Sequence, residues 1–281
     1  AQNVTGWEKF AKFLHENKRI NVFVTGSSSK LLSSEYGTVL AGRHLDIEVR
    51  PLSFREYLLF QGIMTKDNLD IANKRHILKK EFKNYLINGG FPKVAISKTE
   101  TQRKELLETY FRDIIIKDIV KRYKIKEINK IEDLTKYYLT NVSALQSFNN
   151  IKNVLKLNLD TVERFSYYLT TVFLLSFVKK FSYSEKEQLL NPRKVYCADN
   201  GLRNSVAFTF LEDYGKLAEN LVFNSLDRYE QEIFYWKNSK QEEVDFVIKE
   251  KQKIKEIIQV CWNIDKKETR EREIKSLISA C

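Results

Sequence analysis

The side chains best suited to bind metals or act as nucleophiles are few and widely spaced in this sequence. Cysteines occur at Cys197, Cys261 and Cys281, and histidines at positions 15, 44 and 76. Zinc knuckles and disulfide frameworks need closely spaced pairs such as CxxC, and the sequence contains none. The sequence therefore predicts no metal site and no hydrolase triad, and this use of cysteine favours a cytoplasmic location.

One stretch, LDTVERFSYYLTT (159–171), could place side chains on DNA. Its apolar positions 162, 165 and 169 recur at helical spacing, and Asp160 is a suitable N-cap. If those apolar positions face a core, Thr161, Arg164 and Tyr168 face outward as a recognition surface. A single Arg offers few phosphate contacts, so a protein partner for the same helix remains an open alternative.

The elements around this helix have the order of a winged-helix domain. Helices are predicted over 131–141, 147–157 and 159–171, followed by two strands, 172–182 and 193–200, that flank a polar tip. Three helices followed by a β-hairpin are typical of that plan.

The elements that precede and follow differ in pattern. At the N-terminal end, a helix (7–18), a strand (21–25), a second helix and an alternating strand (45–49) indicate α/β structure, and Ser53 with Glu56 predicts a capping box. Helices 74–88 and 99–123 come next. At the C-terminal end, a helix (215–229) precedes strands 232–238, 242–250 and 254–262, with a turn at Lys251 to Lys253, and a final helix begins near residue 268.

Composition agrees with a mainly helical protein that has real cores. The chain is 43% hydrophobic, with only 9 Gly and 3 Pro in 281 residues, and no apolar run reaches the ~18 residues of a membrane span. We therefore expect no membrane contact. Of the net charge of +11, residues 61–128 supply 16 − 9 = +7, so any electrostatic attraction to nucleic acid is concentrated there.

Seven short stretches follow one another along the chain in an order that is typical of one protein family: TGSSSKLLSSE, LAGRHLDIEVRPLSFREYL, NGGFPKV, YFRDIIIKDIVKRYKI, ADNGLRN, EVDFVI and IQVCW. Together they resemble the archaeal-type ATPase family, AAA+/STAND-like P-loop proteins with a C-terminal domain of unknown function. The resemblance covers essentially the whole chain. It implies four parts: the rear of an AAA+ core (1–62), a helical connector (63–128), a winged-helix middle segment (129–200) and a PD-(D/E)XK nuclease-like C-terminal segment (201–281) that ends early.

The nucleotide machinery of that family is incomplete in this sequence. A P-loop requires GxxxxGK[ST], and the nearest string, GTVLAGRH (37–44), lacks both the Lys and the hydroxyl. Although the family uses ATP and Mg²⁺, we expect neither to bind this chain alone. The resemblance implies that Thr25 and Ser27 sense a nucleotide phosphate and that Arg43 acts as an arginine finger toward a neighbouring subunit. The plainer alternatives are a helix N-cap for Ser27 and a surface charge for Arg43.

The nuclease resemblance implies a helix Glu, a strand Asp and a [D/E]xK pair. Glu219 and Asp245 fit the first two positions, but Gln259 and Cys261 replace the carboxylate and the lysine. We expect this site to be inactive.

The resulting hypothesis is part of an AAA+ ATP-binding protein whose middle and C-terminal segments contact nucleic acid or a protein partner. The alternatives are a metal-dependent DNA nuclease and a regulatory protein-binding scaffold. Whether the chain is itself an enzyme stays open, because it lacks the Walker motifs. DNA, a protein partner and a second copy of the chain are all candidate partners.

Overall fold

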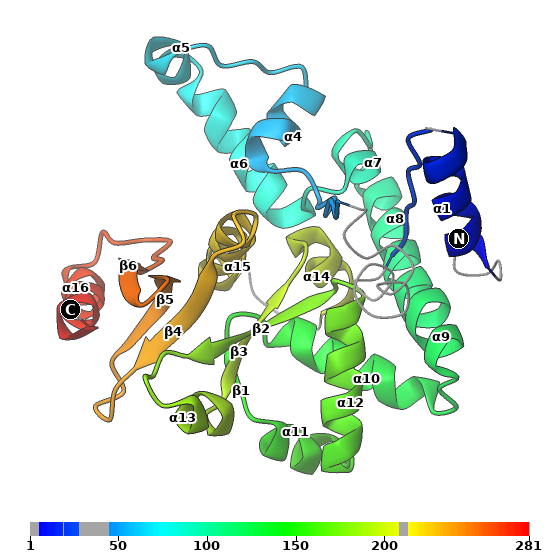
Figure 1. Cartoon of the computed structure of the whole chain (residues 1–281). Helices are drawn as coiled ribbons and strands as arrows, with labels where there is room; N and C mark the ends of the chain where they lie inside the picture. Colours follow the sequence, from blue (N-terminus) through cyan, green and yellow to red (C-terminus); the bar gives the residue numbers. More distant parts are fainter. Residues whose placement is uncertain (1–5, 19, 28–44, 208–212, 281) are drawn as a thin grey trace.

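The computed structural model describes residues 6–18, 20–27, 45–207 and 213–280, and the statements below concern these residues (Figure 1). The helices up to the middle segment are α1 (Trp7–Lys18), α4 (Phe54–Phe60), α5 (Asn68–Asn73), α6 (Arg75–Asn88), α7 (Pro92–Ala95), α8 (Glu100–Asp113), the π-helix η1 (Ile114–Val120) and α9 (Lys121–Tyr123). The later helices are α10 (Ile128–Thr140), α11 (Phe148–Leu155), α12 (Leu159–Thr171), α13 (Glu185–Leu190), α14 (Asn200–Val206), α15 (Tyr214–Asp227) and α16 (Lys267–Ala280). The strands are β1 (Leu145–Gln146), β2 (Leu175–Lys180), β3 (Arg193–Cys197), β4 (Glu232–Lys237), β5 (Glu243–Glu250) and β6 (Lys253–Ile258).

The six strands form one mixed sheet with the order β1-β3-β2-β4-β5-β6. Most neighbours are antiparallel, but β2 and β4 run parallel, with Lys179 opposite Phe234. This parallel pair joins the hairpin of the middle segment to the strands of the C-terminal segment. The two segments therefore share one continuous sheet.

The two strands predicted near the N-terminus do not form among the described residues. Residues 21–26 and 45–50 pair with no described strand, and Phe23, Leu45 and Val49 are each at least 88% exposed. A strand is stable only when a neighbour satisfies its backbone groups, and no described strand pairs with these segments. The prediction of strands here is therefore wrong for this structure, whereas the capping box of Ser53 and Glu56 is confirmed at the start of α4.

The predicted helix 99–123 is confirmed as a continuous rod, but its central part is π-helical. Thr99 caps α8, and η1 and α9 follow without a break. A π-helix is rare and usually marks a functional position. In η1 it lets Ile115, Ile119 and Val120 all reach the core.

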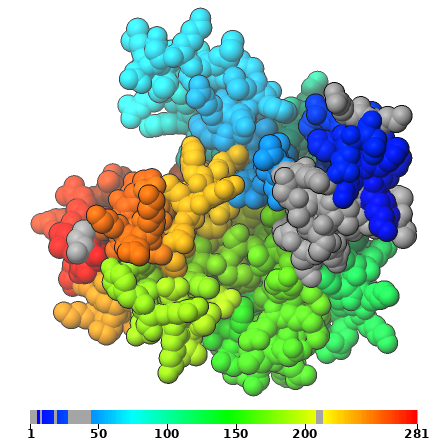
Figure 2. Space-filling model, viewed as in Figure 1, coloured from blue at the N-terminus to red at the C-terminus, as the bar shows by residue number. Residues whose placement is uncertain are grey.

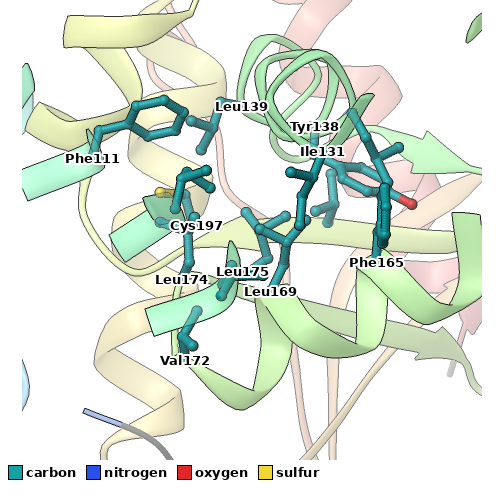
Figure 3. Close-up of a cluster of buried hydrophobic side chains, with 14 of the residues drawn as sticks. Phe111, Ile131, Tyr138, Leu139, Phe165, Leu169, Val172, Leu174, Leu175 and Cys197 are labelled. Carbon is teal, nitrogen blue, oxygen red and sulfur yellow. The ribbon is translucent and has the colours of Figure 1, made fainter. Parts of the chain in front are cut away.

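The helices and the hairpin of the middle segment have the order expected from the sequence, while the winged-helix assignment itself stays a prediction. Asn158, not Asp160, is the N-cap of α12, so Asp160 lies in its first turn. The main core is built from α8, η1, α10, α12 and strands β2 and β3. Figure 3 shows Phe111, Tyr138, Leu169 and Cys197 within it. Because η1 and α12 contribute to the same core, the connector and the middle segment are packed as one unit.

A buried carboxylate ties the connector to the start of α14. The side chain of Asp199 accepts hydrogen bonds from the backbone N–H groups of Gly90 (2.6 Å) and Leu202 (2.9 Å). A Cβ atom at Gly89, whose φ is 77°, would lie 2.0 Å from this carboxylate, so the close approach requires glycine. Burial raises the pKa of Asp199 to about 6.

Within the described residues, no helix is both long enough and apolar enough to cross a membrane.

Candidate functional site

The candidate site lies where the middle and C-terminal segments meet, and three elements build it. Strand β3 directs Lys194 and Tyr196 to one face, because side chains two residues apart share a face. Strand β5 places Glu243 and Asp245 together for the same reason. Helix α15 brings Glu219 over this face, where the Tyr196 hydroxyl donates to it at 2.7 Å.

The ammonium group of Lys194 lies at the centre of these side chains. Its Nζ is 3.0 Å from Glu219 Oε1, 2.8 Å from Glu243 Oε1 and 2.8 Å from Asp245 Oδ1. The Lys194 side chain is only 2% exposed. One buried cation therefore serves three carboxylates, which the sequence analysis did not foresee. We call these four side chains the Lys194 cluster.

The pKa shifts in the cluster follow from burial and charge. Burial alone would lower the pKa of Lys194, but the three carboxylates outweigh it and the net pKa is raised. Burial raises the pKa of Glu219 to about 7 despite the nearby ammonium. Burial also acts to raise the pKa of Glu243, yet Lys194 and Lys237 hold it below its usual range. Lys237 Nζ lies 3.1 Å from Glu243 Oε2 and adds a second cation.

The residues expected to complete a nuclease metal site do not fit that role. The Gln259 side-chain oxygen accepts from the Asp245 backbone N–H at 3.1 Å, and its nitrogen donates to Glu273 at 2.6 Å. Both ends of the amide are thus engaged. Lys194 takes the space between Glu219 and Asp245, and the described residues contain no group of three His, Cys, Asp or Glu arranged to hold a metal ion. We derive no metal-dependent step from this site.

The residues expected to contact a nucleotide are only partly described. Arg43 lies outside the described residues, and Thr25 is exposed. The helix that Ser27 was expected to cap lies outside the described residues, and in the described part its hydroxyl donates to Asp118 Oδ1 at 2.6 Å. Asp118 belongs to η1, so a residue at the N-terminal end of the chain contacts the π-helix of the connector. No local sequence pattern predicts this contact between residues 91 positions apart.

The three residues expected to face DNA from α12 have different surroundings. Arg164 is exposed, but it pairs with Asp160 at 3.0 Å. Tyr168 does not face outward, because its ring stacks on Tyr123 of α9 at 3.6 Å between centroids. Thr161 is half-buried. Of the three positions that the periodicity assigned to solvent, Tyr168 is thus the one that the connector contacts.

A groove of about 650 Å³ lies on another side of α12. Helix α12 lines it with Glu163, Tyr167 and Thr170, and β3 lines it with Arg193. None of these four residues was predicted from the sequence to contact a partner. Periodicity alone does not reveal which side of a helix a neighbouring element leaves open.

Comparisons with known proteins divide the chain into three consecutive matches. Residues 1–58 match an AAA domain. Residues 79–213 match a domain of unknown function (DUF8612), and residues 214–281 match another (DUF4143). The AAA match agrees with the P-loop ATPase resemblance at the N-terminal end. No solved structure matches the chain.

Two relatives are similar over nearly the whole chain. The uncharacterized protein MJ1544 of Methanocaldococcus jannaschii is 33% identical over 98% of this chain and 62% of its own length. An uncharacterized protein of Haemophilus influenzae is 28% identical over 94% of this chain and 64% of its own length. The chain thus spans less than two thirds of either relative.

Proposed function

We propose that this chain works within an AAA-type ATPase, as the part that transmits nucleotide state to a C-terminal segment without catalysis of its own. The observation that carries the proposal is the AAA-domain match of residues 1–58. The phosphate-binding loop, whose motif residues 1–281 lack, would come from another segment of the complete protein. The exposed apolar residues Phe23, Leu45 and Val49 fit strands that such a segment would pair.

Transmission would pass through the hydrogen bond between Ser27 and Asp118. This bond links the AAA-matched segment to η1, whose apolar side chains lie in the main core. Short π-helical segments frequently occur at functional sites, which favours η1 as the element that responds. Arg43 would reach the nucleotide of a neighbouring copy, which makes a homo-oligomer part of the proposal.

The test is steady-state ATP hydrolysis by the complete protein. Arg43→Ala should lower turnover by about 10³-fold, the magnitude typical of an arginine finger. Asp118→Ala should change turnover, whereas Asp113→Ala, which removes a carboxylate one turn earlier that pairs with Lys117 at 2.8 Å, should not. Unchanged hydrolysis in both Arg43→Ala and Asp118→Ala would refute the proposal.

A metal-dependent nuclease is the second candidate, and one observation favours it. Lys194 brings an ammonium beside Glu219 and Asp245, as a nuclease lysine would, although Cys261 occupies the usual position. We expect no Mg²⁺- or Mn²⁺-dependent DNA cleavage, because the Gln259 amide is engaged in hydrogen bonds. Cleavage that Asp245→Ala abolishes would establish the nuclease instead.

The exposed side of α12 favours a protein over DNA as its partner. It carries Asp160 and Glu163 beside one Arg that is already paired, so its charge does not suit phosphates. The nearby groove adds Tyr167, whose exposed ring suits a protein contact.

A further inference from the structure

A row of aromatic rings lies on the surface where the connector meets the C-terminal segment. The Trp262 ring, in the loop between β6 and α16, stacks on Tyr214 at 5.1 Å and 20° and on Phe82 of α6 at 6.4 Å and 10°. Trp262 remains 44% exposed. Lys83 Nζ lies 5.1 Å from the centroid of the Tyr214 ring, so a cation borders the aromatic row.

The same side of α6 carries a basic stripe. Arg75, Lys79 and Lys83 follow one another at four-residue spacing, which places them on adjacent turns about 6 Å apart along the axis. All three are exposed, and neither Arg75 nor Lys79 forms an ion pair with any described residue. The acid of this helix, Glu81, is turned away and accepts from the Tyr57 hydroxyl at 3.0 Å.

The arrangement of the elements leaves this surface open. Helix α6 projects above α15 and the C-terminal strands in Figure 1, and Figure 2 shows an open recess between the cyan arm and the orange and red elements. Contacts between α6 and α15 hold the two sides of the surface together. We call the side chains of Arg75, Lys79, Phe82, Lys83, Tyr214 and Trp262 the Trp262 platform.

We propose that the Trp262 platform binds single-stranded nucleic acid, with a base stacked at Trp262 and the phosphates along the basic stripe. Proteins that bind single strands combine a cationic track with aromatic rings on which bases stack. A duplex hides its base faces, and an acidic peptide would use the cations without the stacking. This inference goes beyond the ATPase proposal and does not depend on it, because none of its residues belongs to the AAA-matched segment.

The experiment titrates the 281-residue chain into a labelled oligothymidine of about 16 nucleotides and follows anisotropy and tryptophan fluorescence. Three phosphate contacts predict a salt slope of about −2, hence roughly 20-fold weaker binding between about 50 and 200 mM salt. Lys79→Ala/Lys83→Ala should reduce the slope to about −0.7 and weaken binding by more than about tenfold at low salt. The matched pair Lys121→Ala/Lys126→Ala removes equal charge from exposed connector positions and should leave binding within about twofold.

Trp262 supplies the second readout. Trp262→Ala should weaken binding at least about fivefold, which corresponds to the ~1 kcal/mol minimum of one stacked base. Trp262→Phe should retain most of the affinity but lose the fluorescence quenching, and it keeps the test valid if the alanine variant fails to fold. No binding at low salt, equal loss in the matched pair, or quenching that survives in Trp262→Phe would overturn the proposal. So would a polyglutamate peptide that binds with the same slope and without quenching, since it would indicate a protein partner.

Discussion

Replacement of Lys194 by Met should destabilise the protein more than any exposed lysine change. Met fills a similar volume but leaves the carboxylates of Glu219, Glu243 and Asp245 without the cation that neutralises them. Removal of one partner from a buried ionic group costs about 3–5 kcal/mol. At about 2 °C per kcal/mol for a chain of this size, the melting temperature should fall by roughly 6–10 °C.

The loss should depend on pH in a defined direction. Burial already raises the pKa of Glu219 to about 7, so this carboxyl stabilises the fold at low pH and loses that contribution as the pH rises through about 7. Without Lys194 the carboxylates repel one another, and their protonation relieves the repulsion. The deficit of Lys194→Met should therefore be smaller at about pH 5.5 than at about pH 8.

The assay is thermal unfolding followed by circular dichroism at both pH values. Lys249→Met is the matched control: Lys249 pairs with Glu232 at 2.9 Å, but both side chains are far more exposed. It should cost less than about 1 kcal/mol. The variant Lys194→Met/Glu219→Gln should recover part of the loss. Equal losses in Lys194→Met and Lys249→Met, or a deficit that does not change with pH, would refute the reasoning.

Three further predictions concern helices α14, α15 and α12. Gly201→Ala should lower the melting temperature, because the new Cβ would lie 2.0 Å from the Asn88 carbonyl oxygen. Gly215→Ala should leave the melting temperature unchanged or raise it, because its nearest contact is at 4.0 Å. Thermal unfolding measures both. Because burial raises the pKa of Asp199 to about 6, this group's stabilising contribution is lost as the pH rises from about 4 to 6. Asp199→Asn should remove that component while it lowers overall stability, since an amide cannot accept both backbone N–H groups; urea unfolding at about pH 4.5 and 7 measures this. Arg164→Ala should change oligonucleotide affinity by less than about twofold, because Arg164 already pairs with Asp160.

Local signals predicted local structure well. The capping box at Ser53 and Glu56 depends on residues three positions apart, and the sequence contains all of its determinants. The strands at 21–25 and 45–49 failed for the opposite reason: a strand depends on a distant partner that alternation cannot supply. Likewise, Tyr168 was assigned to solvent because periodicity does not show that Tyr123 covers it.

The candidate site was predicted in part. The resemblance paired Glu219 with Asp245, and the structure brings them to the same ammonium group, but their proposed roles stay untested. Lys194 was missed because it lies 25 and 51 positions from those acids. A usable signal existed: Lys194 lies inside the predicted strand RKVYC, and a lysine in a strand that packs against a core has to meet a carboxylate.

The continuous sheet limits how the C-terminal segment of this protein can be replaced by recombination. The matches to known families divide at residues 213 and 214, yet β2 pairs with β4 across that division, and Lys194 neutralises acids on the far side. A recombinant that received only a foreign C-terminal segment would acquire a new set of acids facing an inherited lysine. The two sides are therefore expected to be inherited together, because neither half carries a balanced charge without the other.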